Sequence, residues 1–118
     1  MAKTNTGVSQ LQQGVKLDDV SFFGEKRCYK YFIKDANTDV SVRIAMYSGV
    51  ASYTFTPNKI PDKFEEALYK GAEFGNSALL ITPRDRAVNA TSTGLYYLCF
   101  FSHMTSTYSI IVTESPIN

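Results

Sequence analysis

The sequence predicts an all-β domain: an antiparallel β-sandwich of jelly-roll or Greek-key type, with about eight strands and one short helix or irregular crossover. Apolar and polar residues alternate with a period of two almost throughout, which is typical of strands with one buried face. Gly, Pro, Asn, Asp and Ser separate the runs at intervals of roughly 8 to 12 residues, as in small sandwiches. With 118 residues, 44% hydrophobic and 19% charged, the chain suits one packed domain.

The first three strands are expected at residues 15–23, 27–34 and 39–47. The first alternates only loosely. The third alternates cleanly, which indicates a half-buried strand with a solvated outer face. The residues expected to face inward on the second and third strands are Tyr29, Tyr31, Ile33, Val40, Val42, Ile44 and Met46.

The middle of the chain combines two strands with the expected helix. A strand at 52–56 places Tyr53 and Phe55 inward and ends at a proline, which cannot donate to a ladder. At 61–71, a leading proline, early acidic residues and a late lysine followed by glycine resemble helix start and stop signals. A short helix or irregular crossover is therefore expected there, followed by a strand at 77–82.

Two final strands, at 94–102 and 106–113, complete the sandwich. The last one alternates cleanly, with Tyr108, Ile110 and Val112 on its inward face. The chain therefore divides into one domain with short ends. We expect a polar lead-in at 1–10, a single β-sandwich domain at 11–114 and a tail at 115–118.

The charge balance argues against several classes of partner. Twelve Lys and Arg against 11 Asp and Glu give a formal net charge of +1, whereas nucleic acid and anionic lipid both require clustered positive charge. No apolar run approaches the roughly 20 residues of a membrane span. The first 30 residues lack the apolar core of a signal peptide, so none is expected within them. We expect neither a nucleic-acid partner nor membrane insertion.

Seven short segments, read in order, carry a family resemblance over about residues 11–113. They are LQQGV at 11–15, CYKYFI at 28–33, TDVSVRI at 38–44, YSG at 47–49, YTF at 53–55, TGLYYLCF at 93–100 and STYSIIV at 106–112. Together they resemble the motifs of bacterial pre-peptidase C-terminal domains.

The resemblance implies a jelly-roll sandwich that is one module of a secreted or surface protein, often one attached to a protease. Family members do not catalyse a reaction; some bind collagen or polysaccharide, and others assist the folding or secretion of a neighbouring domain. The chain has Val50, Ala51 and Ser52 where the family usually has acidic residues. The family's calcium sites have no convincing counterpart, so no cofactor is expected and calcium lacks a supporting motif.

Two strands carry outward residues that suggest a contact surface. The outward face of the second strand holds Cys28 and Phe32 among lysines. Placing alternate residues of the penultimate strand in the core, as the resemblance suggests, turns Tyr97, Cys99 and Phe101 outward. If the two strands are adjacent, the cysteines can form a disulfide and the aromatic residues one exposed patch, typical of a contact surface. Alternatively, a flanking domain covers these residues, or a bulge turns them into the core.

Four further features need separate interpretations. Tyr47, outward beside Arg43, is another candidate for the same surface. The lysines also suit an edge strand, which they protect against aggregation. Asn89 begins an Asn-Ala-Thr sequon, which carries a glycan if the chain is exported or else occurs by chance. The cysteines lie 71 residues apart, without the spacing of a zinc or redox site.

The residue inventory argues against catalysis and metal binding. His103 is the only histidine, and its four-residue distance from Cys99 would bring the side chains together on a helix but not on a strand and turn. The acidic residues match no calcium loop, and 35–39 is more simply a turn. Arg84 and Arg86 are expected in a solvated turn. We predict no metal site and no enzyme.

These observations favour a non-catalytic accessory or binding module of a larger extracellular or cell-surface protein. Its partners would be neighbouring domains of the parent chain and a carbohydrate or protein bound by an outer sheet face. The alternative is an intracellular structural or scaffold domain with a C2-like sandwich, similar in architecture to that of calpains, and hence a cytoplasmic location. The missing signal peptide motivates that alternative, whereas oxidised cysteines would oppose it.

Overall fold

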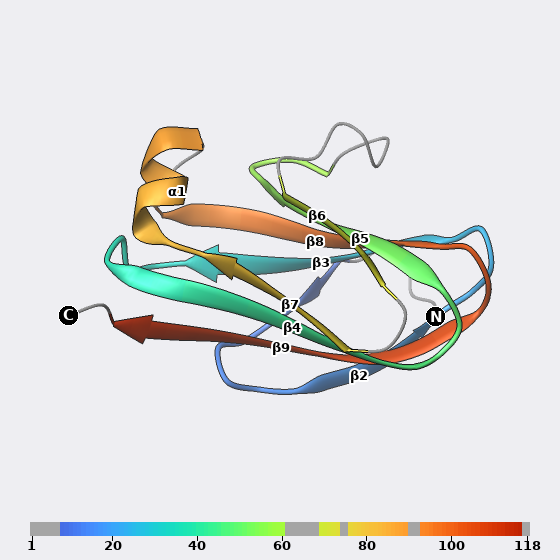
Figure 1. Ribbon diagram of the computed structural model, residues 1–118. Coiled ribbons are helices and arrows are strands. Elements are labelled where there is room, and N and C mark those ends of the chain that lie inside the picture. The colour runs from blue at the N-terminus through green and yellow to red at the C-terminus, as the bar shows by residue number, and fades with distance from the viewer. Residues whose placement is uncertain (1–7, 61–68, 74–75, 90–92, 117–118) are drawn as a thin grey trace.

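The computed structural model describes residues 8–60, 69–73, 76–89 and 93–116. This part of the chain forms nine strands and one helix, arranged as two facing sheets (Figure 1). The elements are β1 (Ser9–Gln10), β2 (Leu17–Ser21), β3 (Lys26–Ile33), β4 (Thr38–Ser48), β5 (Ala51–Pro57), β6 (Tyr69–Glu73), β7 (Asn76–Ile81), α1 (Pro83–Asn89), β8 (Gly94–Ser102) and β9 (Ser106–Pro116).

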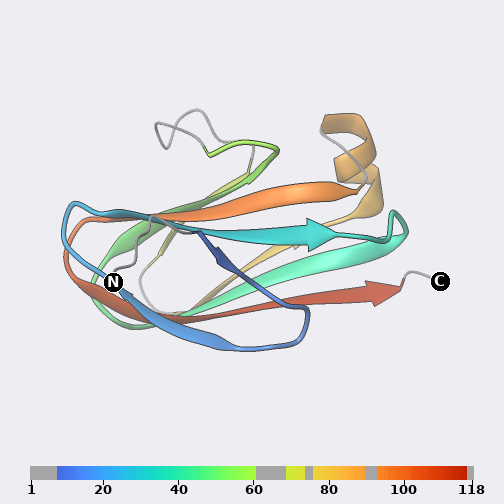
Figure 2. The ribbon, with the colours of Figure 1, turned by 180° about the vertical axis from the view of Figure 1, so that it is seen from behind.

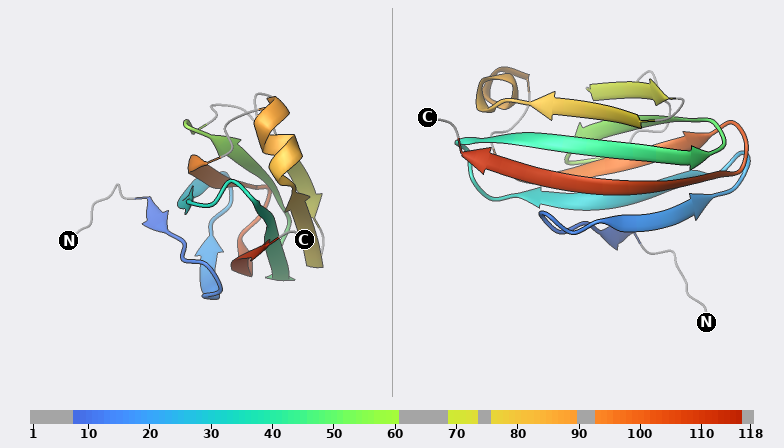
Figure 3. Two further views of the ribbon diagram at one scale, coloured as in Figure 1. Left: turned by 90° about the vertical axis from the view of Figure 1, so that its left-hand side faces the viewer. Right: turned by 60° about the horizontal axis from the view of Figure 1, so that its bottom comes forward.

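The strands are connected as in a jelly roll. One sheet has the order β1-β3-β8-β5-β6, and the other has the order β2-β9-β4-β7, seen from the front in the right-hand view of Figure 3. From β2 to β5, and again from β6 to β9, each strand lies in the opposite sheet from the one before it. The predicted all-β jelly-roll sandwich is therefore confirmed.

The core lies between the two sheets and is rich in aromatic rings. Phe100 of the five-stranded sheet stacks on Tyr108 of the four-stranded sheet, with ring centroids 4.2 Å apart. Within the five-stranded sheet, Phe55 stacks on Tyr96 at 4.9 Å. The predicted inward faces are confirmed, since the following alternating residues are all buried: Tyr29, Tyr31, Ile33, Val40, Val42, Ile44, Tyr53, Phe55, Tyr96, Leu98, Phe100, Tyr108, Ile110 and Val112.

A polar network joins the two sheets inside this aromatic core. The Tyr29 hydroxyl on β3 donates to Asp19 Oδ2 on β2 at 2.7 Å and lies 2.7 Å from the Tyr108 hydroxyl on β9. Because Tyr29 has one proton and gives it to the carboxylate, Tyr108 donates to Tyr29. Arg27 Nε and the Val20 amide also donate to the Asp19 carboxylate, each at 2.8 Å.

The network changes the acidity of its members. Burial, the largest single cause, raises the pKa of Asp19, but the hydrogen bonds from Tyr29, Arg27 and the Val20 amide together lower it below its usual value. Burial raises the pKa of Tyr108 to about 12. The folded chain therefore favours an ionised Asp19 beside neutral tyrosines.

The described helix lies at 83–89, where the sequence analysis expected a solvated turn. Residues 61–68 of the expected helix lie outside the described residues, and its final residues belong to β6. The helix α1 instead begins at Pro83, directly after Thr82. The Thr82 hydroxyl accepts from the Asp85 amide at 3.1 Å, and the Asp85 carboxylate accepts from the Thr82 amide at 3.3 Å, which is a capping box.

The expectation of a solvated turn at Arg84 and Arg86 is wrong for Arg86. Arg84 is exposed, but Arg86 is fully buried. Its guanidinium donates to the carbonyl oxygens of Thr38, Asp35 and Ile81 at 2.9, 3.2 and 3.3 Å. Because two of these acceptors lie in and beside the β3–β4 turn, Arg86 connects α1 to that turn.

The described fold extends beyond the expected domain limits. Ser9 and Gln10, placed in the predicted lead-in, form β1 and pair in parallel with Tyr29 and Lys30. At the other end, β9 continues to Pro116, within the predicted tail. Both ends of the sandwich are therefore longer than the alternating sequence pattern suggests.

We expect an Asp19→Asn substitution to reduce stability at neutral pH by about 1–3 kcal/mol, since it replaces the acceptor of charge-assisted hydrogen bonds. The pKa of Asp19 is lower in the folded than in the unfolded chain, so its stabilisation is present above about pH 4 and lost as pH falls through the folded-state pKa. Urea unfolding across this range should therefore show the two proteins converging in stability at acid pH. A difference that stays constant with pH would contradict the assignment.

We expect Arg86→Met to destabilise the protein by about 2–4 kcal/mol, because it removes the guanidinium donor from two buried carbonyl oxygens and one part-buried one. Arg84→Met is the matched control, and on an exposed side chain it should change stability by less than about 0.5 kcal/mol. Urea unfolding measures both. Equal effects of the two substitutions would mean that the buried arginine does not support the β3–β4 turn.

Candidate functional site

A disulfide lies on the outer face of the five-stranded sheet. Strands β3 and β8 are antiparallel neighbours, and their register sets Cys28 opposite Cys99 with the Cα atoms 4.0 Å apart. Tyr29 and Leu98, next to them, point into the core, so by alternation the cysteines lie on the other face of the sheet, where Cys28 is half-buried and Cys99 is fully buried. The bond joins residues 71 positions apart and closes a loop that contains most of the sandwich.

Three aromatic residues flank the disulfide on the same face, and we call them the aromatic row: Phe32, Tyr97 and Phe101. Phe32 has 47% of its surface exposed, and the other two are half-buried. Lys30 is opposite Tyr97, so Phe32, two residues further along β3, is a diagonal neighbour of Tyr97. No bulge turns these residues into the core.

The aromatic row is divided rather than gathered into one cluster. Along β8, Cys99 stands between Tyr97 and Phe101, so the disulfide separates their rings. Lys26 lies opposite Phe101 and Lys30 opposite Tyr97. Each of these two rings therefore has a lysine on the neighbouring strand, and the disulfide lies between the two ring–lysine pairs.

Tyr47 does not belong to this surface. It lies on β4, in the four-stranded sheet, whereas the aromatic row belongs to the five-stranded sheet. Its side chain is 59% exposed, as an outward residue should be. The prediction that it shares the surface with Phe32 is wrong, because alternation along one strand does not reveal which sheet the strand joins.

The residues considered for catalysis are arranged differently from the sequence expectation. Cys99 is bonded to Cys28 and supplies no thiolate, so it forms no dyad with His103. Instead, His103 Nε2 lies 2.9 Å from the Ser52 hydroxyl. Within the described residues, no hydrogen bond joins a carboxylate to His103, so the third member of a hydrolytic triad is not present there.

The acidic residues and the sequon add no assembled site. The Asn37 amide donates to Asp35 Oδ1 at 2.8 Å, which is the turn expected at 35–39. The residues that the structure describes contain no group of three His, Cys, Asp or Glu side chains placed to hold a metal ion. Asn89 is the last residue of α1, and Ala90 and Thr91 of its sequon lie outside the described residues.

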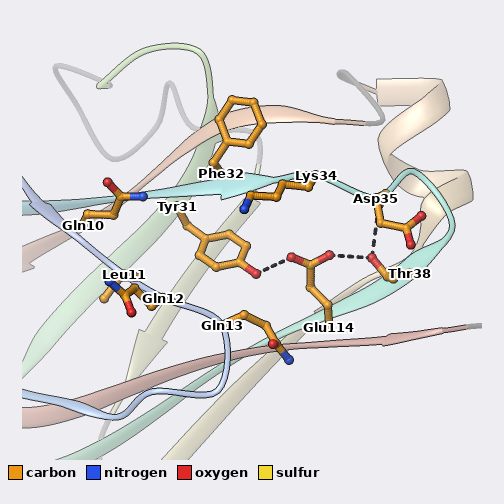
Figure 4. A pocket seen from close by; sticks show the side chains of 10 residues that line it. All are labelled: Gln10, Leu11, Gln12, Gln13, Tyr31, Phe32, Lys34, Asp35, Thr38 and Glu114. Carbon is orange, nitrogen blue, oxygen red and sulfur yellow. Dashed lines mark hydrogen bonds between the residues drawn. The ribbon is translucent and has the colours of Figure 1, made fainter.

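A pocket that the sequence analysis missed opens beside Phe32 (Figure 4). It measures about 610 Å³ and lies at the edge of β3. Figure 2 shows how the chain leaves β1 beside β3 and crosses to the other sheet. No local signal could have identified it, because three distant segments form its walls. Its lining residues are Gln10, Leu11, Gln12, Gln13, Tyr31, Phe32, Lys34, Asp35, Thr38 and Glu114.

The floor of the pocket is a carboxylate held by two hydroxyl groups. Tyr31 donates to Glu114 Oε2, and Thr38 donates to Glu114 Oε1 at 2.8 Å. Figure 4 shows the two donors approaching Glu114 from opposite sides. Burial, followed by the hydrogen bond to Glu114, raises the pKa of Tyr31 above its usual value, so this tyrosine keeps its proton at physiological pH.

Exposed apolar side chains gather at the opposite end of the sandwich. Phe22 and Phe23 in the β2–β3 loop and Met104 in the β8–β9 loop are 60%, 75% and 50% exposed. The Gly24 amide donates to the Ser102 carbonyl at 3.0 Å and holds the two loops together. The sequence analysis assigned both phenylalanines to a strand at 15–23, but β2 ends at Ser21. Gly24, which follows them and adopts a φ of +80°, was the sequence signal for a turn.

Comparison with known proteins identifies the fold but no family. No protein-family model matches the sequence, and no curated protein matches it either. Within the described residues, none of the helices has the length and apolar character needed to cross a membrane.

Two solved structures share the architecture. The pre-peptidase C-terminal domain of a collagenase from Bacillus anthracis has a TM-score of 0.62 and 11% identity, with 95% of this chain and 100% of that chain covered. The periplasmic inhibitor of g-type lysozyme from Aeromonas hydrophila, PliG, has a TM-score of 0.62 and 16% identity, with 92% and 96% covered. The chain therefore has a β-sandwich similar to a pre-peptidase C-terminal domain, as its motifs predicted.

Reduction of the disulfide should destabilise the chain by about 4 kcal/mol, on the chain-entropy model for a loop of 71 residues. Urea unfolding with and without dithiothreitol measures the loss. The Cys28→Ala and Cys99→Ala double variant should be less stable and should not respond to the reductant. Two titratable thiols in the denatured, non-reduced protein would contradict the bond.

Proposed function

We propose that this chain is a non-catalytic binding module of an exported protein, and that it contacts a carbohydrate or protein partner through its aromatic row. The observation that carries the proposal is the disulfide-braced pair β3 and β8, which displays Phe32, Tyr97 and Phe101 on one outer face. Aromatic side chains on rigid backbone supply contact area at low conformational cost and are frequent binding hot spots.

The flanking lysines suit such a surface. Lys30 and Lys26 stand directly opposite Tyr97 and Phe101, so each ring has a long cationic side chain beside it. Lysine stems add apolar contact area, while the charged ends donate hydrogen bonds to hydroxyl, carbonyl or carboxylate groups of a partner. A glycan and a polar protein surface both offer these acceptors.

The disulfide supports an oxidising compartment. Such bonds persist in extracellular and periplasmic proteins and are rare in the cytosol. The two similar structures agree with this placement, since one is a domain of a collagenase and the other is a periplasmic inhibitor. We therefore prefer an extracellular or cell-surface location to the cytoplasmic C2-like alternative.

The proposal of a non-catalytic role rests on the residues at the best candidate for chemistry. The Ser52 and His103 pair lies at the loop end of the sandwich, where His103 is exposed. A serine nucleophile requires an oriented base and donors for the developing oxyanion. Among the described hydrogen bonds, none joins the His103 imidazole to a carboxylate. Ser52 lies within strand β5 and not in a strained turn.

The test is binding to an immobilised panel of collagen, chitin, cellulose, peptidoglycan and g-type lysozyme. We expect at least one to retain the protein, and the Phe32→Ser, Tyr97→Ser, Phe101→Ser triple variant to bind it at least about tenfold more weakly. Phe23→Ser, which removes one exposed ring from the β2–β3 loop outside the aromatic row, is the control and should bind normally. Circular dichroism confirms that both variants are folded.

The proposal fails if the protein binds none of these materials, or if the triple variant binds as well as the unchanged protein. Loss of binding in Phe23→Ser alone would move the contact surface to the loop end. Because the disulfide remains in all three proteins, reduced binding by the folded triple variant reports the rings themselves.

A further inference from the structure

The pocket at the edge of β3 exists because β1 pairs with only the middle of that strand. The Leu11 amide donates to the Lys30 carbonyl at 2.8 Å, and the chain then turns away toward the four-stranded sheet. The Gly14 amide donates to the Val112 carbonyl on β9 at 2.7 Å. Residues 10–14, which we call the strap, form one wall of the pocket, and buried Leu11 and the Gly14 hydrogen bond hold this segment in place.

The strap presents hydrogen-bonding groups that the protein does not itself use. Gln10, Gln12 and Gln13 are exposed and line the pocket. Within the described chain, no hydrogen bond engages their side-chain amides. Each amide offers one carbonyl acceptor and two N–H donors, so this wall can both donate to and accept from a ligand.

The Glu114 carboxylate on the floor of the pocket adds a hydrogen-bond acceptor whose position the protein fixes. Each oxygen of Glu114 accepts one hydroxyl proton, from Tyr31 or Thr38. A carboxylate has about four acceptor positions, so two remain for hydroxyl groups of a ligand. Because protein donors already orient this carboxylate, a ligand need not order it on binding.

The charges around the pocket balance. Glu114 and Asp35 contribute two negative charges to its lining, and Lys34 contributes one positive charge. The Arg86 guanidinium lies directly behind, where it donates to the carbonyl oxygens of Asp35 and Thr38. The surroundings therefore favour neither a strongly cationic nor a strongly anionic ligand.

Phe32 supplies the apolar part of the site. Its ring is 47% exposed and belongs to the lining of the pocket, and Figure 4 shows it on the other side of β3 from Tyr31 and Glu114. A ligand there meets one apolar face and several amide and carboxylate groups. The volume, about 610 Å³, falls in the range of roughly 300–1,000 Å³ that small-ligand pockets occupy, although this lining is more polar than most.

We propose that this edge pocket binds one neutral pyranose unit of a saccharide. A pyranose ring combines hydroxyl groups that both donate and accept with a C–H face that packs on an aromatic ring. The Gln12 and Gln13 amides and the Glu114 carboxylate hold the hydroxyl groups, and Phe32 contacts the C–H face. The site adds to the proposed function and shares only Phe32 with the aromatic row.

The test is titration of the whole, oxidised protein with methyl glycosides of glucose, galactose, mannose and N-acetylglucosamine, followed by NMR. At least one sugar should bind with a millimolar or tighter dissociation constant and shift the backbone amide resonances of Gln12 and Gln13. Gln12→Ala and Glu114→Gln should each weaken that binding about tenfold, which corresponds to about one hydrogen bond. Lys16→Ala, an exposed change just before β2 and outside the pocket lining, is the control and should not affect it.

Further variants separate this site from the aromatic row. The Tyr97→Ser, Phe101→Ser double variant should bind the sugar normally, even where it loses the partner of the proposed function. Phe32→Ser should weaken sugar binding. If Glu114→Gln unfolds the chain, Gln12→Ala still decides the matter, because this side chain is exposed and makes no hydrogen bond to the described protein.

Three outcomes would overturn the inference. In the first, none of the four sugars shifts the resonances of the strap. In the second, Gln12→Ala binds sugar as tightly as the unchanged protein, which would place the sugar elsewhere. In the third, spermidine shifts these resonances and depends on Glu114, while no sugar does, which would make the pocket a cation site.

Discussion

The pairing register of β3 with β8 is the constraint on which the rest of the structure depends. Cys28 stands opposite Cys99, and this alignment turns Tyr29 and Leu98 into the core on the other side of the same sheet. A shift of one residue would exchange the two faces, exposing the core rings and burying the lysines. The disulfide resists such a shift, because the cysteines meet only in the observed register.

The same strand also joins the two layers. Tyr29, one residue from the disulfide, reaches across the core to Asp19 and Tyr108 in the four-stranded sheet. A buried polar group without a partner costs free energy, so the two sheets must align in a way that keeps these hydrogen bonds. Apolar packing alone restricts the alignment less strictly. The disulfide at Cys28 and the hydrogen bonds of Tyr29 therefore fix the two faces of β3 at adjacent residues. The surfaces formed by β3 are built on this fixed segment.

The two surfaces proposed to bind partners are neighbours on one strand, β3. The aromatic row occupies the outer face, and the polar pocket opens at the strand's edge, with Phe32 in both. A contact surface on paired strands loses little conformational entropy when a partner binds. The two surfaces differ in chemistry, since rings and lysines form the first and amides with Glu114 form the second. One long glycan, or a glycosylated protein, offers groups suited to both.

The sequence by itself determined the layer type and the inward face of most strands, since period-two alternation is a local property that burial on one side imposes. Alternation also put Cys28 on an outward face, whereas the same placement of Cys99 came from the family resemblance. Only the tertiary structure decided which strands are neighbours, and hence that Tyr47 lies apart from Phe32 and that Gln12 and Glu114 line one pocket. Arg86 shows the reason: its burial depends on carbonyl groups from distant segments, and no local pattern records where such partners will lie.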